Sequence, residues 1–150
     1  MRFTMAVLLT TILMAPVWAQ NSGACVPATT HGTYSVECSG FMSPAAGAPQ
    51  VPVSVLGTTT GDWGGTFTGS AKVSLGGTIV DQTVKGTLVG NSDCTGSISY
   101  TQKINGQPAP TLNIVAHTLD DGKEIVGMSV DAGVNMICHL KLMTRTPSGQ

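Results

Sequence analysis

Residues 66–90 read TFTGSAKVSLGGTIVDQTVKGTLVG, and this stretch decides the fold. The odd positions 67–75 carry Phe, Gly, Ala, Val and Leu, whereas the even positions 66–74 carry Thr, Thr, Ser, Lys and Ser. After Gly76-Gly77 the alternation resumes, with Val80, Val84 and Leu88 sharing one face. Alternation with period two is typical of a strand that has one buried face, and a Gly-Gly pair favours a tight hairpin. The stretch therefore predicts two antiparallel strands.

The same pattern extends in both directions along the chain. Turn signals such as Asn91-Ser92-Asp93, Asn105-Gly106 and Asp120-Asp121-Gly122 separate further alternating segments. No stretch shows a helical period. The pattern predicts eight strands, at about 32–40, 51–59, 64–75, 78–90, 94–104, 110–119, 123–131 and 133–142, with one long connection at 41–50.

Short turns between successive strands imply that neighbouring strands are antiparallel. Eight such strands with one apolar face close most simply into an up-and-down barrel, which also removes exposed sheet edges. The predicted fold class is therefore an all-β, eight-stranded antiparallel up-and-down barrel. The alternative is an open two-sheet β-sandwich.

The N-terminus has the pattern of a secretory signal peptide. Arg2 precedes an apolar run from Met5 to Met14, and the small residue Ala19 precedes an expected cleavage site between Ala19 and Gln20. No later stretch reaches the length of an apolar membrane span. We expect a signal peptide at 1–19, a single domain at 20–143, a disordered tail at 144–150, and a secreted or periplasmic protein.

The charge content narrows the range of partners. The 150 residues include 10% charged side chains, and the net charge is −1. Seven Lys and Arg residues without clustering provide no footprint for nucleic acid or for an anionic membrane surface. We expect neither as a partner, and the sequence leaves the oligomeric state open.

The four cysteines, Cys25, Cys38, Cys94 and Cys138, predict two disulfides, because their number is even and the chain is exported. Closing the barrel pairs the first strand with the eighth, where Cys38 and Cys138 both have the inward phase. Cys25 precedes the first strand and Cys94 opens the fifth, at the same end, which favours a Cys25–Cys94 bridge. A sequence-local alternative joins Cys25 to Cys38 and Cys94 to Cys138. The wide spacings do not match a metal site.

Several segments resemble a group of small secreted bacterial β-proteins. They are Gly32-Thr33-Tyr34 after Cys25, GSAKVSLGGT at 69–78, NSDCTG at 91–96 and DGKEI at 121–125. In that group a cysteine before the first strand recurs together with the cysteine of an Asp-Cys-Thr-Gly turn, which implies a Cys25–Cys94 bridge here. The implied shape is similar to allene-oxide-cyclase-like and lipocalin-like barrels, and the resemblance carries no catalytic motif.

Polar residues in the inward phase mark a candidate site. Gln82 and Gln102 fall on adjacent strands, where we expect them to bond each other, and Glu124 is placed in phase with Val126 and Met128. A buried carboxylate must pair, take up a proton or contact water or a ligand. Small residues leave room for a cavity at several inward positions: Gly57, Gly69, Ala71, Gly86, Gly96 and Ala116.

These observations support three hypotheses. The first is a secreted module that binds a small apolar or amphipathic ligand, with no cofactor, in a lumen lined by Tyr34, Phe67, Gln82, Ile98, Tyr100, Gln102, Glu124 and Met128. The second is a structural or surface-interaction protein of the cell envelope or matrix. The third is an isomerase- or cyclase-type enzyme with Glu124 as its acid or base. The histidines, His31, His117 and His139, are expected on the surface rather than at a metal.

Overall fold

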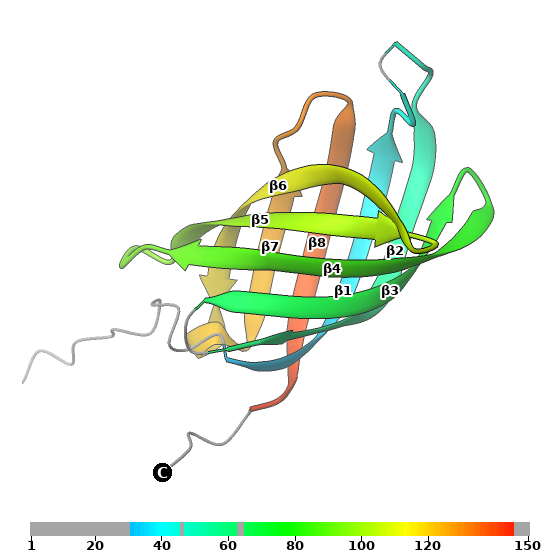
Figure 1. Ribbon diagram of the computed structural model, residues 1–150. Helices are drawn as coiled ribbons and strands as arrows, with labels where there is room; N and C mark the ends of the chain where they lie inside the picture. The colour runs from blue at the N-terminus through cyan, green and yellow to red at the C-terminus, as the bar shows by residue number, and fades with distance from the viewer. Residues whose placement is uncertain (1–30, 46, 63–64, 146–150) are drawn as a thin grey trace, which may run out of the picture.

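The computed structural model describes residues 31–145 except 46, 63 and 64. Figure 1 shows a single sheet that wraps into a closed barrel, in which the strands follow one another in chain order. The strands are β1 (Gly32–Met42), β2 (Val51–Gly61), β3 (Thr66–Leu75), β4 (Thr78–Gly90), β5 (Thr95–Ile104), β6 (Gln107–Leu119), β7 (Glu124–Ser129) and β8 (Val134–Thr144). Every neighbouring pair is antiparallel, including β1 with β8.

The predicted up-and-down barrel is confirmed, and the open sandwich is wrong because β1 pairs with β8 along its length. β6 begins at Gln107, three residues before its predicted start, although Pro108 and Pro110 are among its first four residues. A register shift between Tyr100 and Gln102 accommodates this segment. Proline cannot donate to a ladder, so its presence near a bulge at the strand's end follows from its missing N–H.

The ends of the chain fall largely outside the described residues. The predicted signal peptide at 1–19 and Cys25 lie there, as do residues 146–150 of the predicted tail. The first residue of that tail, Thr144, belongs instead to β8, and the Arg145 guanidinium donates a hydrogen bond to the Asp121 carbonyl oxygen at 3.0 Å. The barrel domain therefore extends to residue 145.

The register determines how wide the barrel is. From Val89 on β4, directly paired residues lead through the other seven strands and return to β4 at Ile79. The offset is ten residues (89 minus 79), which corresponds to a strand tilt of roughly 40°. Eight-stranded barrels that are packed solid with side chains have a smaller offset and a tilt of about 36°. This barrel is therefore wider than the filled kind.

One disulfide fastens the seam between the first and last strands. Cys38 and Cys138 are directly paired in the β1–β8 ladder, with their Cα atoms 4.0 Å apart, and both side chains are buried. This bond confirms the prediction from barrel closure and excludes the sequence-local pairing. The Cys25–Cys94 bridge stays a prediction, because Cys25 lies outside the described residues. A disulfide is typical of an oxidising, extracytoplasmic compartment.

The outer surface is covered by short polar side chains. Thr58, Thr68 and Ser99 are among the exposed positions that alternate with buried or partly buried ones. Threonine fits the pleated surface of a strand and carries no charge, which explains the low charged fraction. Within the described ranges, no helix has the length and apolar character needed to span a membrane.

Candidate functional site

The barrel encloses a cavity of about 270 Å³. Its lining includes Gly61 and Thr66 at one end of the barrel and Met42 and Ile104 at the other. The lining side chains are mostly aliphatic or aromatic. Small inward residues contribute to the space: at Gly86, an added Cβ would lie 2.6 Å from the Tyr100 Cβ and 2.7 Å from the Phe67 ring. Glycine at this position therefore leaves room for two aromatic side chains in the lumen.

The structure places six of the eight predicted lining residues on the cavity wall: Tyr34, Phe67, Gln82, Ile98, Tyr100 and Gln102. The other two, Glu124 and Met128, lie on the outer face of β7. The Met128 side chain is 52% exposed, and Glu124 Oε1 lies 3.7 Å from Nδ1 of His139 on the neighbouring strand. The expectation that these two residues face the lumen is therefore wrong.

The error comes from the composition of β7. Its outward positions carry Val126 and Met128 beside Glu124, whereas its inward positions carry Gly127 and Ser129 beside Ile125, so hydrophobicity does not distinguish the two faces. A Cβ at Gly127 would lie 2.5 Å from the Ile114 side chain, which occupies the space inside. The buried Ser129 hydroxyl is satisfied at the end of the ladder, where it donates to the Val134 carbonyl oxygen and accepts from the Met136 amide. Local packing, not hydrophobicity, sets the phase of this strand.

A hydrogen-bonded pair of glutamines forms the polar part of the lumen. Gln82 Nε2 donates to Gln102 Oε1 at 2.6 Å, and Gln102 Nε2 donates to the Pro110 carbonyl oxygen at 3.0 Å. The two residues are only 7% and 8% exposed. The expected bond between Gln82 and Gln102 is confirmed. The sequence gives no signal for the third member, because the Pro110 carbonyl becomes available only through the register shift in the β5–β6 ladder.

Tyr100 lies one inward position from Gln102 on β5. Its side chain lines the cavity, and no group in the described part of the chain forms a hydrogen bond with its hydroxyl. Burial, with a smaller contribution from the negative charge of Asp131, raises the pKa of Tyr100 to about 12. The phenol therefore stays protonated at physiological pH and remains available to a guest in the lumen.

Tyr34 closes the end of the barrel where the chain enters β1. Its hydroxyl donates to the Gly122 carbonyl oxygen at 2.6 Å, in a buried environment. Gly122 ends a turn in which Asp120, Asp121 and Gly122 all have positive φ, at 47°, 53° and 78°. Two non-glycine residues in this region carry strain, so the bond from Tyr34 helps to hold the turn in place. Burial raises the pKa of Tyr34, and the positive charge of Arg145 partly opposes that effect.

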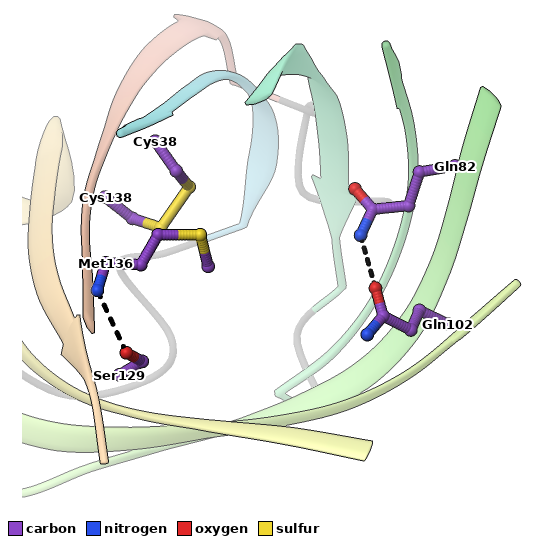
Figure 2. Close-up of a disulfide and its surroundings, with 6 residues drawn as sticks. All are labelled: Cys38, Gln82, Gln102, Ser129, Met136 and Cys138. Atoms are coloured by element: carbon purple, nitrogen blue, oxygen red, sulfur yellow. Dashed lines mark hydrogen bonds between the residues drawn. A yellow bond between two sulfur atoms is a disulfide. The ribbon is translucent and has the colours of Figure 1, made fainter. Parts of the chain in front are cut away.

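The two sides of the lumen differ in chemistry, as Figure 2 shows. The Gln82–Gln102 pair lies on the β4–β5 side, and the Cys38–Cys138 disulfide and Met136 lie across from it. Sulfur atoms and aliphatic groups therefore face the amide groups across the cavity. This arrangement is compatible with a ligand that has one polar end and an apolar body.

The histidines do not form a site. His117 and His139 are exposed on the outer face, as expected, and each pairs with Val126 on β7 from opposite sides. His31 is buried, so the expectation of a surface position is wrong for this residue. Across the described ranges, no three His, Cys, Asp or Glu side chains come together in a way that would hold a metal ion.

Comparison with known proteins does not assign a family. No family model matches the chain, and no curated protein matches it significantly. The chain forms an eight-stranded antiparallel closed β-barrel, and this fold is compatible with ligand binding.

Proposed function

We propose that this protein is a secreted module that binds a small, neutral, largely apolar molecule in the barrel lumen. The observation that carries the proposal is the cavity of about 270 Å³, which has a mostly apolar wall and a few polar groups gathered on one side. Pockets of this kind, with an apolar lining and a small number of placed polar groups, are typical of small-molecule sites. The volume is just below the usual range for such sites, which begins at about 300 Å³, and this favours a compact ligand.

The charges around the cavity favour a neutral ligand. Asp62 is the one charged residue among the described lining residues, and it lies at the end of the barrel. Its carboxylate already accepts bonds from the Thr66 amide and hydroxyl. A carboxylate or ammonium group in the middle of the lumen would lose its hydration without gaining a counter-ion, which is strongly unfavourable.

The proposal is tested with a neutral fluorescent probe, N-phenyl-1-naphthylamine, titrated into the purified disulfide-bonded protein. We expect saturable binding with increased emission. Val84 lines the cavity and is directly paired with Gly69 on the neighbouring strand. Val84→Phe places a larger side chain in the lumen and should weaken binding about tenfold or more. The control is Thr83→Phe, because Thr83 is the exposed neighbour on the same strand.

Two results would contradict the proposal. One is the absence of saturable binding to the parent protein. The other is equal binding by the parent and Val84→Phe when circular dichroism shows both to be folded, because the probe would then bind outside the lumen.

A second candidate, a surface-interaction protein, is favoured by an apolar row on the outer face. Val115, Met128 and Ile137 are directly paired across β6, β7 and β8, and they are 45%, 52% and 50% exposed. A contiguous apolar patch of this kind is a common feature of interaction surfaces. Sedimentation velocity of the parent and of Met128→Lys tests it: concentration-dependent association that the substitution abolishes supports the role, and a monomer at all concentrations argues against it.

The enzyme hypothesis loses the residue on which it depended. An isomerase or cyclase needs an acid or base that touches the substrate, and Glu124 lies outside the barrel next to His139. The proposed function therefore does not include catalysis.

A further inference from the structure

We infer that the lumen selects a neutral alcohol, whose hydroxyl group donates a hydrogen bond to Oε1 of Gln82 while its apolar body extends toward the disulfide wall. This inference rests on the proposed function, because it names the ligand class for the same cavity. It follows from the direction of the hydrogen bonds among Pro110, Gln102 and Gln82.

The direction of the bonds is fixed at Pro110. A carbonyl oxygen only accepts, so Gln102 must present its Nε2 to Pro110 at 3.0 Å. The Gln102 oxygen then faces Gln82 and accepts from Gln82 Nε2 at 2.6 Å. This arrangement leaves the Gln82 Oε1 at the end of the chain as an acceptor. Swapping the oxygen and nitrogen of either amide would place two acceptors or two donors against each other, so the assignment follows from the network.

The Gln82 oxygen is exposed to the lumen. It accepts no hydrogen bond from the described residues, and these residues contain no fully enclosed side-chain oxygen or nitrogen that lacks a partner. Although Gln82 is only 7% exposed, its Oε1 must therefore contact open space, and this residue lines the cavity. In Figure 2 the amide oxygen of Gln82 points away from Gln102 and toward the interior. A buried acceptor of this kind attracts a donor.

A hydroxyl group satisfies the site better than a neutral group that only accepts hydrogen bonds. It donates to Gln82 Oε1, an acceptor that has no partner among the described residues. An ether or ketone only accepts and leaves the Gln82 oxygen unpaired. The hydrogen bonds along the glutamine chain also polarise one another, which strengthens the terminal acceptor. Across the lumen, the Cys38–Cys138 disulfide and Met136 provide an apolar surface for the rest of the molecule.

The experiment compares three probes that share one chain length: 1-octanol, 1-methoxyoctane and octanoate. Each competes with N-phenyl-1-naphthylamine for the disulfide-bonded parent protein at pH 7.4. We expect 1-octanol to displace the reporter at about a tenfold lower concentration than the ether, which corresponds to one net hydrogen bond. The ether is the more hydrophobic of the two, so burial alone would produce the opposite order. Octanoate should compete weakly because the described lining residues include no cation.

Substitution of the acceptor locates the effect. Gln82→Met keeps the length of the side chain and removes the amide, so the affinity for 1-octanol should fall about tenfold to that of the ether, whose affinity should stay unchanged. Thr83→Met is the matched control, because this outward neighbour should leave both affinities as in the parent. A further measurement needs no variant: 1-octanol should shift the side-chain amide resonance of Gln82 in the parent, and the ether should not.

The outcomes separate this inference from the proposed function. If the reporter binds and the ether displaces it as well as 1-octanol does, the lumen binds apolar molecules but the hydroxyl preference is refuted. A preference that survives in Gln82→Met, with the amide resonance unmoved by 1-octanol, also refutes it. If neither the reporter nor any of the three probes binds the parent, both proposals fall together.

Discussion

The β4–β5 wall and the β1–β8 wall of the same barrel are stabilised by different interactions. The first contains a chain of hydrogen bonds from Gln82 through Gln102 to the Pro110 carbonyl, and beside it the Tyr100 hydroxyl has no partner among the described residues. The second contains a covalent bond between Cys38 and Cys138, packed with Met136.

The disulfide wall therefore stabilises the fold, whereas the glutamine wall presents polar groups to the lumen. The disulfide has no hydrogen-bonding capacity left to offer a guest, and it fixes the seam at which the ring closes. The glutamine wall has an unused acceptor and an unused phenol, and both remain inside the lumen. Polar groups that form no hydrogen bond within the folded protein are the ones that can recognise a ligand.

The largest effect should come from the covalent wall. Replacing both cysteines, Cys38→Ala with Cys138→Ala, releases a loop in which the two residues are separated by 100 positions. The chain-entropy account predicts a loss of about 4 to 5 kcal/mol in the free energy of unfolding, measured by urea denaturation. A loss below about 1 kcal/mol would show that the β1–β8 ladder closes the barrel without the bond.

The next effect comes from breaking the polar wall at its centre. Gln102→Leu leaves both the Gln82 amide and the Pro110 carbonyl oxygen without their partners, and should lower the free energy of unfolding by about 2 to 3 kcal/mol. Adding Gln82→Met should restore part of this loss, because the second substitution removes one stranded donor. A double-mutant cycle in urea checks it. Simple additivity would mean that the two glutamines act independently.

The two walls also differ in how well the sequence predicts them. Alternation places the eight strands and the inward phase of Cys38, Cys138, Gln82 and Gln102, because these residues lie on strands of 10 to 13 residues, which are long enough for the alternation to set the phase. It fails on β7, where valine and methionine face outward while glycine and serine face inward. Hydrophobicity carries no signal for a glycine that is required by the neighbouring Ile114 side chain.

The remaining elements of the site depend on three-dimensional detail that periodicity does not contain. The Pro110 carbonyl accepts a bond only because the β5–β6 register shifts, and the shift itself arises at a proline-rich segment that reads as a loop. The ten-residue offset around the ring is a sum over eight registers, so a change in any one hairpin would alter the width of the lumen.

The two tyrosines compare a hydroxyl that the fold uses with one that it leaves free. Tyr34→Phe strands the buried Gly122 carbonyl oxygen and should lower the free energy of unfolding by about 1 to 2 kcal/mol. Tyr100→Phe removes a hydroxyl that has no partner in the described part of the chain, so it should change stability by less than about 0.5 kcal/mol at pH 7. Urea denaturation of the two variants provides the comparison. Equal losses would mean that the Tyr100 hydroxyl is engaged in the folded protein.

At high pH the stability of the parent protein should differ from that of Tyr100→Phe, although the two should be nearly equal at pH 7. Burial raises the pKa of Tyr100 to about 12, above the ordinary value of 10.0, so the folded protein retains a proton that the unfolded chain loses. The resulting contribution to stability is fully present below pH 10 and disappears as the pH rises through about 12. The parent should therefore lose stability more steeply than Tyr100→Phe across this interval, in urea series from pH 9 upward.

The chain contains only two tyrosines, so absorbance at 295 nm resolves their ionisation, and in Tyr100→Phe only Tyr34 remains to titrate. An ordinary midpoint near 10 for Tyr100 would mean that water fills the lumen around its hydroxyl, and the polar wall would then be a solvated surface instead of a recognition site.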